Sequence, residues 1–147
     1  GKYIAVAYST GTDGKGCGAV IYKIDGETLD GKWGEWGVNQ AGTEKAVAKE
    51  KLSDSMGSFN VSGTNGNGTA YKGTLIIRRV SDEVYQFGWD TGTKVLGTGV
   101  RMGDYLAAGS GSKQCGFVIY EQKGNTLDGK WGVPGATKLG VETATKK

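Results

Sequence analysis

An 18-residue segment occurs twice in this chain, with its copies 98 residues apart, and 13 of the 18 positions are identical. The first copy spans residues 17–34 (CGAVIYKIDGETLDGKWG), and the second spans residues 115–132 (CGFVIYEQKGNTLDGKWG). Self-similarity at a fixed offset defines the building block of a fold, because each repeat buries its apolar face against neighbouring units. The chain is therefore expected to be assembled from duplicated parts.

Each copy has the pattern of a β-hairpin. In the first copy, residues 19–24 form an apolar run, an Asp-Gly turn follows at residues 25–26, and residues 28–33 return. Asp-Gly between such runs is a strong hairpin signal. In the returning run, Leu29 and Trp33 share one face and charged residues occupy the other, which is typical of a strand with one buried side. We expect this tryptophan, and its repeat counterpart Trp131, to lie in the core.

The repeat extends on both sides of the 18-residue segment. Residues 42–49 correspond to residues 140–147, and the first copy of this part could also form a short helix, since Glu, Lys and Ala favour one. The second copy prefers strand, so we expect strands in both. The repeat halves then span residues 1–50 and 103–147 and flank a central segment at residues 57–102.

These patterns predict one all-β domain over residues 1–147. One complete unit of about eight short strands would run from residue 59 to the end, and the first 50 residues would repeat its last four strands. Eight antiparallel strands suffice for an up-and-down barrel. Glycine at 28 of 147 residues indicates many turns and bulges. We therefore expect an antiparallel barrel, or a barrel-like sheet of about 8–12 strands, whose extra half joins the same sheet or pairs with a neighbour.

The two cysteines, Cys17 and Cys115, occupy the same position of the two repeats. A disulfide would need Cα atoms within about 4.4–6.8 Å, and two separate buried thiols are the alternative. We favour the disulfide because the remaining sequence reads as that of a secreted, cell-surface or periplasmic protein.

Composition argues against several functional classes. Eighteen basic and 15 acidic residues are mixed along the chain, with a net charge of +3, whereas nucleic-acid binding needs a clustered basic face. No apolar run approaches the roughly 18–20 residues of a membrane-spanning helix. Histidine is absent, which removes His-dependent nucleophilic catalysis and His-based metal sites. We expect no enzyme activity and no cofactor.

Acidic residues nevertheless recur at marked positions. Asp30 and Asp128 are the repeated acids, and paired carboxylates could act in acid–base catalysis, but solvation or cross-strand pairing is the simpler interpretation. Acidic turns at residues 13–14, 25–26 and 90–92 could supply oxygen ligands to calcium. Turn chemistry alone explains them, so no metal site is predicted.

Five residues are candidates for ligand binding. Tyr85 and Trp89 lie on one strand face, where they would form core or line the pocket of a barrel with an unfilled mouth. An inward Arg79 or Arg101 would need a carboxylate or an anionic ligand, although a strand end that reaches solvent is preferred. Trp36 has a proline as its repeat counterpart, so the core does not require it. An exposed indole could stack on a sugar or anchor a protein contact, and covering the end of the barrel is the alternative.

A set of recurring elements in the second part of the chain resembles a repeat family of secreted bacterial proteins without a named function. These elements are residues 71–74 (YKGT), 85–89 (YQFGW), 97–100 (GTGV) and 118–131. The overall style is similar to calycin-type barrels such as avidins, but an avidin or lipocalin signature is lacking, so biotin binding is not implied.

Two functions follow as hypotheses. The first is a non-catalytic extracytoplasmic binding module for a small ligand or glycan, based on the barrel pattern and its aromatic residues. The alternative is a self-assembling extracellular or cell-surface subunit of a fibre or coat, which would associate with copies of itself through sheet edges.

Overall fold

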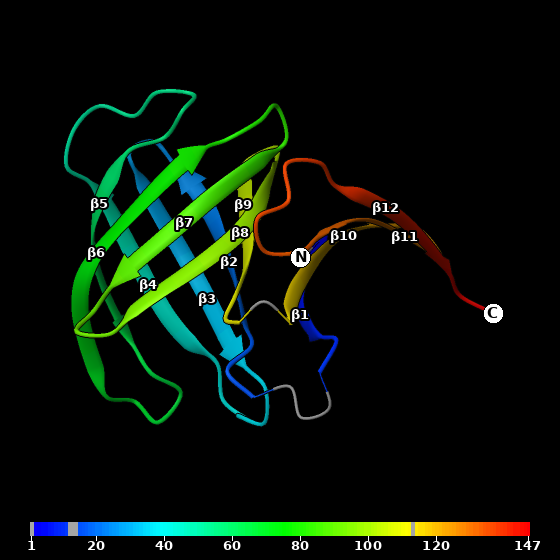
Figure 1. Cartoon of the computed structure of the whole chain (residues 1–147), viewed down its shortest axis with the longest axis horizontal. Coiled ribbons are helices and arrows are strands. Elements are labelled where there is room, and N and C mark those ends of the chain that lie inside the picture. The colour runs from blue at the N-terminus through cyan, green and yellow to red at the C-terminus, as the bar shows by residue number, and fades with distance from the viewer. Residues whose placement is uncertain (1, 12–14, 113) are drawn as a thin grey trace.

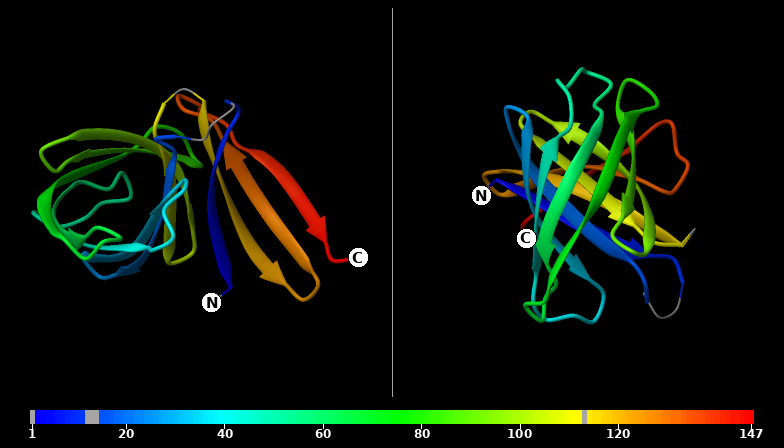
Figure 2. Two further views of the ribbon diagram at one scale, coloured as in Figure 1. Left: turned by 90° about the horizontal axis from the view of Figure 1, so that it is seen from below. Right: turned by 90° about the vertical axis from the view of Figure 1, so that its left-hand side faces the viewer.

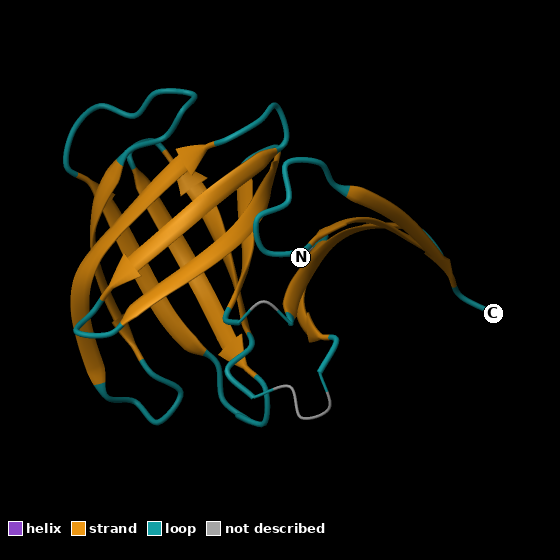
Figure 3. Ribbon diagram, in the orientation of Figure 1, coloured by secondary structure: helices purple, strands orange, loops and turns teal. Residues whose placement is uncertain are grey.

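The computed structural model describes residues 2–11, 15–112 and 114–147, and this part of the chain forms twelve β-strands and no helix. The predicted all-β class is confirmed (Figure 1, Figure 3). The strands are β1 (Tyr3–Ser9), β2 (Gly18–Asp25), β3 (Thr28–Glu35), β4 (Gly42–Ala48), β5 (Ser58–Thr64), β6 (Ala70–Arg79), β7 (Val84–Asp90), β8 (Lys94–Met102), β9 (Tyr105–Ser110), β10 (Cys115–Lys123), β11 (Thr126–Gly132) and β12 (Gly140–Thr145). The corresponding segments β4 and β12 are both strands, as predicted.

Strands β2 to β9 close into an antiparallel barrel in sequence order, and β9 completes it by pairing with β2 (Figure 2). The predicted up-and-down barrel is thus confirmed, but the predicted unit from residue 59 to the end is wrong. The barrel instead uses residues 18–110. Strands β2 and β10 have nearly the same sequence, so either could pair with β9. The half that forms the barrel wall has the apolar Ile24 at an inward position where the other half has Gln122.

The remaining strands form a second sheet with the order β1-β10-β11-β12, called here the outer sheet. The two repeat halves have therefore exchanged their first strands: β1 pairs with β10, while its counterpart β9 pairs with β2. Phe117 and Ile119 of the outer sheet pack against Val100 and Ala107 on the outside of the barrel. The predicted alternative in which the extra half joins the same sheet is wrong, because only one half can occupy that place in the barrel and the other forms a separate sheet.

Alternating side chains fill the interior of the barrel. Its most buried large residues come from both the repeat half and the central strands; they are Tyr22, Leu29, Phe59, Leu75, Ile77, Phe87 and Leu106. The connection between β4 and β5 (residues 49–57) covers one end, where Leu52 and Met56 pack against the core. We call this the closed end and the opposite end the mouth.

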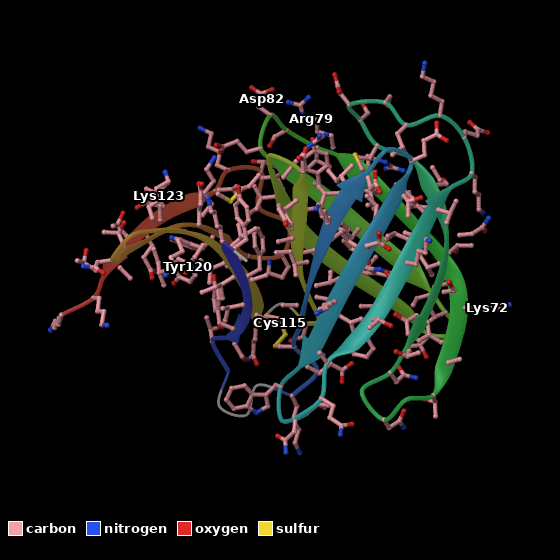
Figure 4. All side chains as sticks on the ribbon, turned by 180° about the vertical axis from the view of Figure 1, so that it is seen from behind. Lys72, Arg79, Asp82, Cys115, Tyr120 and Lys123 are labelled. Atoms are coloured by element: carbon pink, nitrogen blue, oxygen red, sulfur yellow. A yellow bond between two sulfur atoms is a disulfide. The ribbon has the colours of Figure 1, made fainter. Side chains whose placement is uncertain are left out.

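A disulfide joins Cys17 to Cys115 with a Cα–Cα distance of 5.4 Å. Cys17 directly precedes β2 and Cys115 begins β10, so the bond ties corresponding points of the two halves together (Figure 4 labels Cys115). It therefore fastens the outer sheet to the barrel.

Candidate functional site

The mouth of the barrel contains a cavity of about 420 Å³. Its walls come from strand ends of both the repeat half and the central strands, so the closure of the barrel assembles them. The lining residues include Val20, Tyr22, Trp33, Glu35, Glu44, Asn65, Tyr71, Trp89, Thr91, Thr93, Val95 and Ser110.

Glu44 of β4 is the central polar residue of this cavity, and only 6% of it is exposed. Its Oε1 accepts a hydrogen bond from the Tyr71 hydroxyl (2.9 Å), and its Oε2 accepts hydrogen bonds from the Tyr22 hydroxyl and from Trp89 Nε1, the latter at 3.2 Å. Trp89 Nε1 also lies 3.0 Å from the Tyr22 hydroxyl. Three neutral donors from β2, β6 and β7 therefore surround one buried carboxylate, as buried charges require.

Glycines in the neighbouring strands provide the space for the aromatic rings. A Cβ atom at Gly31 would lie 2.6 Å from the ring of Tyr22, and one at Gly42 would lie 2.3 Å from the ring of Trp33. Both distances are well below van der Waals contact. The rings lie directly over glycines of the adjacent strand, which sets the shape of the cavity wall.

The pKa values of Tyr22 and Tyr71 are both raised. Burial is the larger cause for each phenol, and the nearby Glu44 carboxylate is the second. Both phenols are therefore neutral donors at physiological pH. None of the described residues that line the cavity is basic, whereas two of them, Glu44 and Glu35, are acidic. The mouth consequently has a negative potential that no neighbouring side chain in its wall offsets.

Trp33 contributes a further polar group to the wall. Its Nε1 atom is buried and close enough to Tyr71 to act on that side chain, but it forms no hydrogen bond of good geometry with a described residue. Its ring meets Tyr71 edge-on, with the ring centroids 6.3 Å apart. A buried donor without a partner costs free energy, so this atom is a point at which a ligand acceptor would be favourable.

The structure places two of the predicted aromatic residues in different surroundings. Trp89 lies at the mouth and contacts Glu44. Tyr85, on the same strand face, is 5% exposed within the core and is not among the described residues that line the cavity. The alternation along β7 was predicted, but only the strand end reaches the mouth.

The two predicted arginines do not reach the cavity. The Arg79 side chain is exposed, donates hydrogen bonds to the backbone oxygens of Ser81 and Asp82, and lies 3.7 Å from the Asp82 carboxylate (Figure 4). Arg101 is also exposed and donates to the backbone oxygen of Gly103. Both lie at turns of the closed end, so the structure agrees with the preferred alternative of strand ends in solvent.

The tryptophans of the repeat also differ from one another. Trp36 is 68% exposed, as expected of a residue outside the core, and borders a groove of about 500 Å³ between β1 and the barrel. Trp33 packs against the barrel core, but its counterpart Trp131 is 39% exposed. The prediction of a core Trp131 is wrong because its sheet is not closed into a barrel.

The acidic positions behave as surface residues. Asp30 is exposed, and Asp128 lies 3.3 Å from Lys123 in an ion pair on the outer sheet. The turn at residues 13–14 lies outside the described residues. Within the described ranges, no group of three or more acidic or cysteine side chains could hold a metal ion.

Sequence reasoning missed the three residues that organise the mouth. Tyr22, Glu44 and Tyr71 were not among the predicted site residues. A signal was present in β4, where Gly42, Glu44 and Ala46 alternate on the inward face and a carboxylate therefore occupies an apolar position.

Comparison of the chain with protein-family models, curated proteins and solved structures found no match. In the part of the chain that the structure describes, no helix is long and apolar enough to cross a membrane.

Proposed function

We propose that the protein is a non-catalytic extracytoplasmic binding module whose barrel mouth binds a small organic cation, such as an alkylammonium with an apolar body. The observation that carries this proposal is a cavity with aromatic walls and two carboxylates but no basic residue among the described lining residues. The disulfide between Cys17 and Cys115 supports an oxidising compartment.

The lining chemistry favours a cation over other ligands. Trp33, Tyr71 and Trp89 present aromatic surfaces, and a cation over such a face gains roughly 0.5–2 kcal/mol, more when it is desolvated. Glu44 already accepts three hydrogen bonds, so it attracts the ligand through its charge and not as an additional acceptor. A cavity of about 420 Å³ lies within the range of roughly 300–1,000 Å³ typical of small-molecule sites.

The same contacts argue for binding without catalysis. A general acid or base must exchange its proton with a substrate during the reaction. Glu44 is held by three neutral donors, and the two tyrosines keep their protons because their pKa values are raised. These groups form a fixed acceptor and its donors, which suits a preformed binding surface.

The experiment compares three probes of similar size: benzyltrimethylammonium, neutral neopentylbenzene and anionic benzenesulfonate. We expect calorimetry and tryptophan fluorescence to detect binding of the cation in preference to the other two. Glu44→Gln should weaken cation binding at least about tenfold, or roughly 1.4 kcal/mol. This amide removes the charge and keeps one acceptor oxygen, which can face Tyr22 and Trp89, while its NH2 group would face Tyr71, whose hydroxyl can turn to accept.

A matched control is Glu50→Gln, which removes the same charge from an exposed residue at the closed end. It should leave cation binding unchanged. Equal binding of the neutral or anionic probe, or equal affinity of the Glu44→Gln protein and the unmodified chain, would contradict the proposal.

The structure also favours a second candidate function, that of a self-assembling subunit. Strands β1 and β12 are the edges of the outer sheet, and each pairs with a single strand among the described residues. Such edges are templates for pairing with another chain. Sedimentation velocity over a concentration series should then show assembly, and a strict monomer at every concentration would argue against this function.

A further inference from the structure

The outer sheet has the backbone register of the barrel half that it duplicates. In the barrel, Gly31 lies opposite both Tyr22 and Glu44. In the outer sheet, Gly129 lies opposite both Tyr120 and Glu142. The four strands of the outer sheet therefore have the pairing of half a barrel.

The side chains repeat the arrangement of the mouth as well. The Tyr120 hydroxyl donates a hydrogen bond to Glu142 Oε1 (2.7 Å), as Tyr22 does to Glu44. A Cβ atom at Gly140 would lie 2.1 Å from the ring of Trp131, so this tryptophan covers its glycine as Trp33 covers Gly42. Half of the barrel mouth is thus present a second time (Figure 4 shows Tyr120 on the outer sheet).

These residues belong to one surface of the outer sheet, called here its inner face because the corresponding surface points into the barrel. The inner face contains Ile4, Val6, Val118, Tyr120, Gln122, Leu127, Trp131, Glu142 and Ala144. Gln122 lies at the end of this face that corresponds to the closed end of the barrel, where Ile24 holds the same position.

Apolar residues at the β1 edge of the inner face are exposed to solvent, whereas the equivalent residues of the barrel are buried. Ile4 and Val6 are 44% and 38% exposed, whereas Leu106 and Ala108, which hold the same positions on β9, are 0% and 1% exposed. Trp131 of the same face is 39% exposed, whereas Val118 beside it is only 7% exposed. Exposed apolar residues that gather on one face in this way mark an interaction site. The barrel of the same chain indicates which kind of segment fits this surface, because strands β5 to β8 cover the equivalent surface there.

We propose that the outer sheet is a docking surface for a four-stranded segment of the β5–β8 type from another repeat unit, which would complete a second barrel. Such a segment would pair with β12 as β5 pairs with β4, and with β1 as β8 pairs with β9. This inference rests on the second candidate function and is independent of the ligand proposed for the first.

Glu142 argues for this occupant over a second outer sheet. In the barrel, the equivalent carboxylate of Glu44 receives two of its hydrogen bonds from Tyr71 and Trp89, which belong to β6 and β7. Two outer sheets closed on each other would instead bury two Glu142 carboxylates in one interior. Within β1, β10, β11 and β12 no basic residue lies on this face, and Lys2 and Lys146 continue its alternation only beyond the strand ends. Neither charge would therefore have a basic partner within the sheet.

The test extends the full chain at its C-terminus with a second copy of residues 49–102, which contains the β4–β5 connection and β5 to β8. We expect hydrogen exchange of the β1 and β12 amides to slow at least about tenfold relative to the unextended chain, because both edges gain a hydrogen-bonded neighbour. Exchange in β2 to β9 reports in the same experiment that the original barrel is folded.

A second extended chain carries a copy of residues 49–110, which also contains β9. The copied β9 can take the place of β1 beside β10, so closure of the second barrel in this chain does not require β1. Unchanged exchange in β12 of both extended chains would overturn the proposal. Slow exchange of β1 and β12 in the unextended chain, together with a dimer in solution, would overturn it in favour of closure between two outer sheets.

A matched substitution distinguishes specific docking from nonspecific association. Glu142→Gln should have little effect on exchange in the unextended chain, where Glu142 is exposed and contacts Tyr120. In the extended chain it should reverse part of the β12 protection, as should Tyr71→Phe with Trp89→Phe in the appended segment. Ligand binding at the original mouth should persist in every variant, so failure of docking is separable from failure of the ligand proposal.

Discussion

Removal of the disulfide should reveal how much the junction between barrel and outer sheet contributes to stability. We consider the variant Cys17→Ala with Cys115→Ala, because both residues are buried and small apolar replacements avoid new unpaired polar groups. The bond closes a loop with a sequence separation of 98 residues. The chain-entropy model assigns about 4.7 kcal/mol to a loop of this length at 25 °C.

That loss is large against the roughly 5–15 kcal/mol of a typical domain. It should also be distributed unevenly. The interior of the barrel does not involve the sulfur atoms, whereas the outer sheet is attached to the barrel by the disulfide and by the cluster around Phe117 and Ile119. We therefore expect the free energy of unfolding to fall by about 4–5 kcal/mol and the outer sheet to lose exchange protection first.

Urea unfolding followed by circular dichroism measures the first effect, and hydrogen exchange resolved by strand measures the second. Ser112→Ala is a suitable control, since its hydroxyl lies 3.6 Å from the Cys115 sulfur without forming part of the bond. A loss below about 1 kcal/mol would refute the loop-closure argument. Earlier loss of protection in β2 to β9 than in β10 to β12 would refute the assignment of the disulfide to the attachment of the outer sheet.

Two further predictions concern the mouth. Gly31→Ala should lower the free energy of unfolding by about 1–3 kcal/mol, because the new methyl group would meet the buried Tyr22 ring; a urea midpoint equal to that of the unmodified chain would show that the ring can move aside. The raised pKa of Tyr22 means that the folded state keeps a proton that the unfolded state loses above about pH 10, so stability is complete below that pH and declines above it by about 1.4 kcal/mol per pH unit. In Tyr22→Phe this part of the alkaline slope should be missing from urea titrations between about pH 10 and 11, and an unaltered slope would contradict the origin assigned to it.

The fold class could be predicted because its signals are local. Alternation of apolar and polar residues and the Asp-Gly turn at residues 25–26 indicate strands and hairpins from near neighbours alone. The choice of strands that close the barrel could not be predicted in the same way. Strands β2 to β4 and β10 to β12 have nearly the same sequence and the same register, so local patterns do not distinguish their places.

The candidate site depends on which strands close the barrel, so most of its residues could not be predicted from the sequence. Trp89 could be identified because aromatic residues alternate along β7. Glu44 had only a weak signal, its place in the inward alternation of β4, because the same residues resemble a short helix and its three donors come from strands distant in sequence. Identical repeat residues also acquire different environments: Trp33 packs against the core, while Trp131 is exposed.

Small differences between the repeats explain which half occupies the barrel. Ile24 packs against the barrel core near the closed end, whereas the equivalent position of the second copy is Gln122, which is exposed. Placing Gln122 in the barrel would bury an amide where the first copy buries an apolar side chain, and an unpaired buried amide costs roughly 1–3 kcal/mol. A second inward position also differs, because Ala48 packs against the barrel core and its counterpart in the second copy is Lys146. Both differences favour the first half as the barrel wall. The half that the barrel does not use remains a preformed surface, since its tyrosine, carboxylate and tryptophan already have the arrangement that the central strands cover in the barrel.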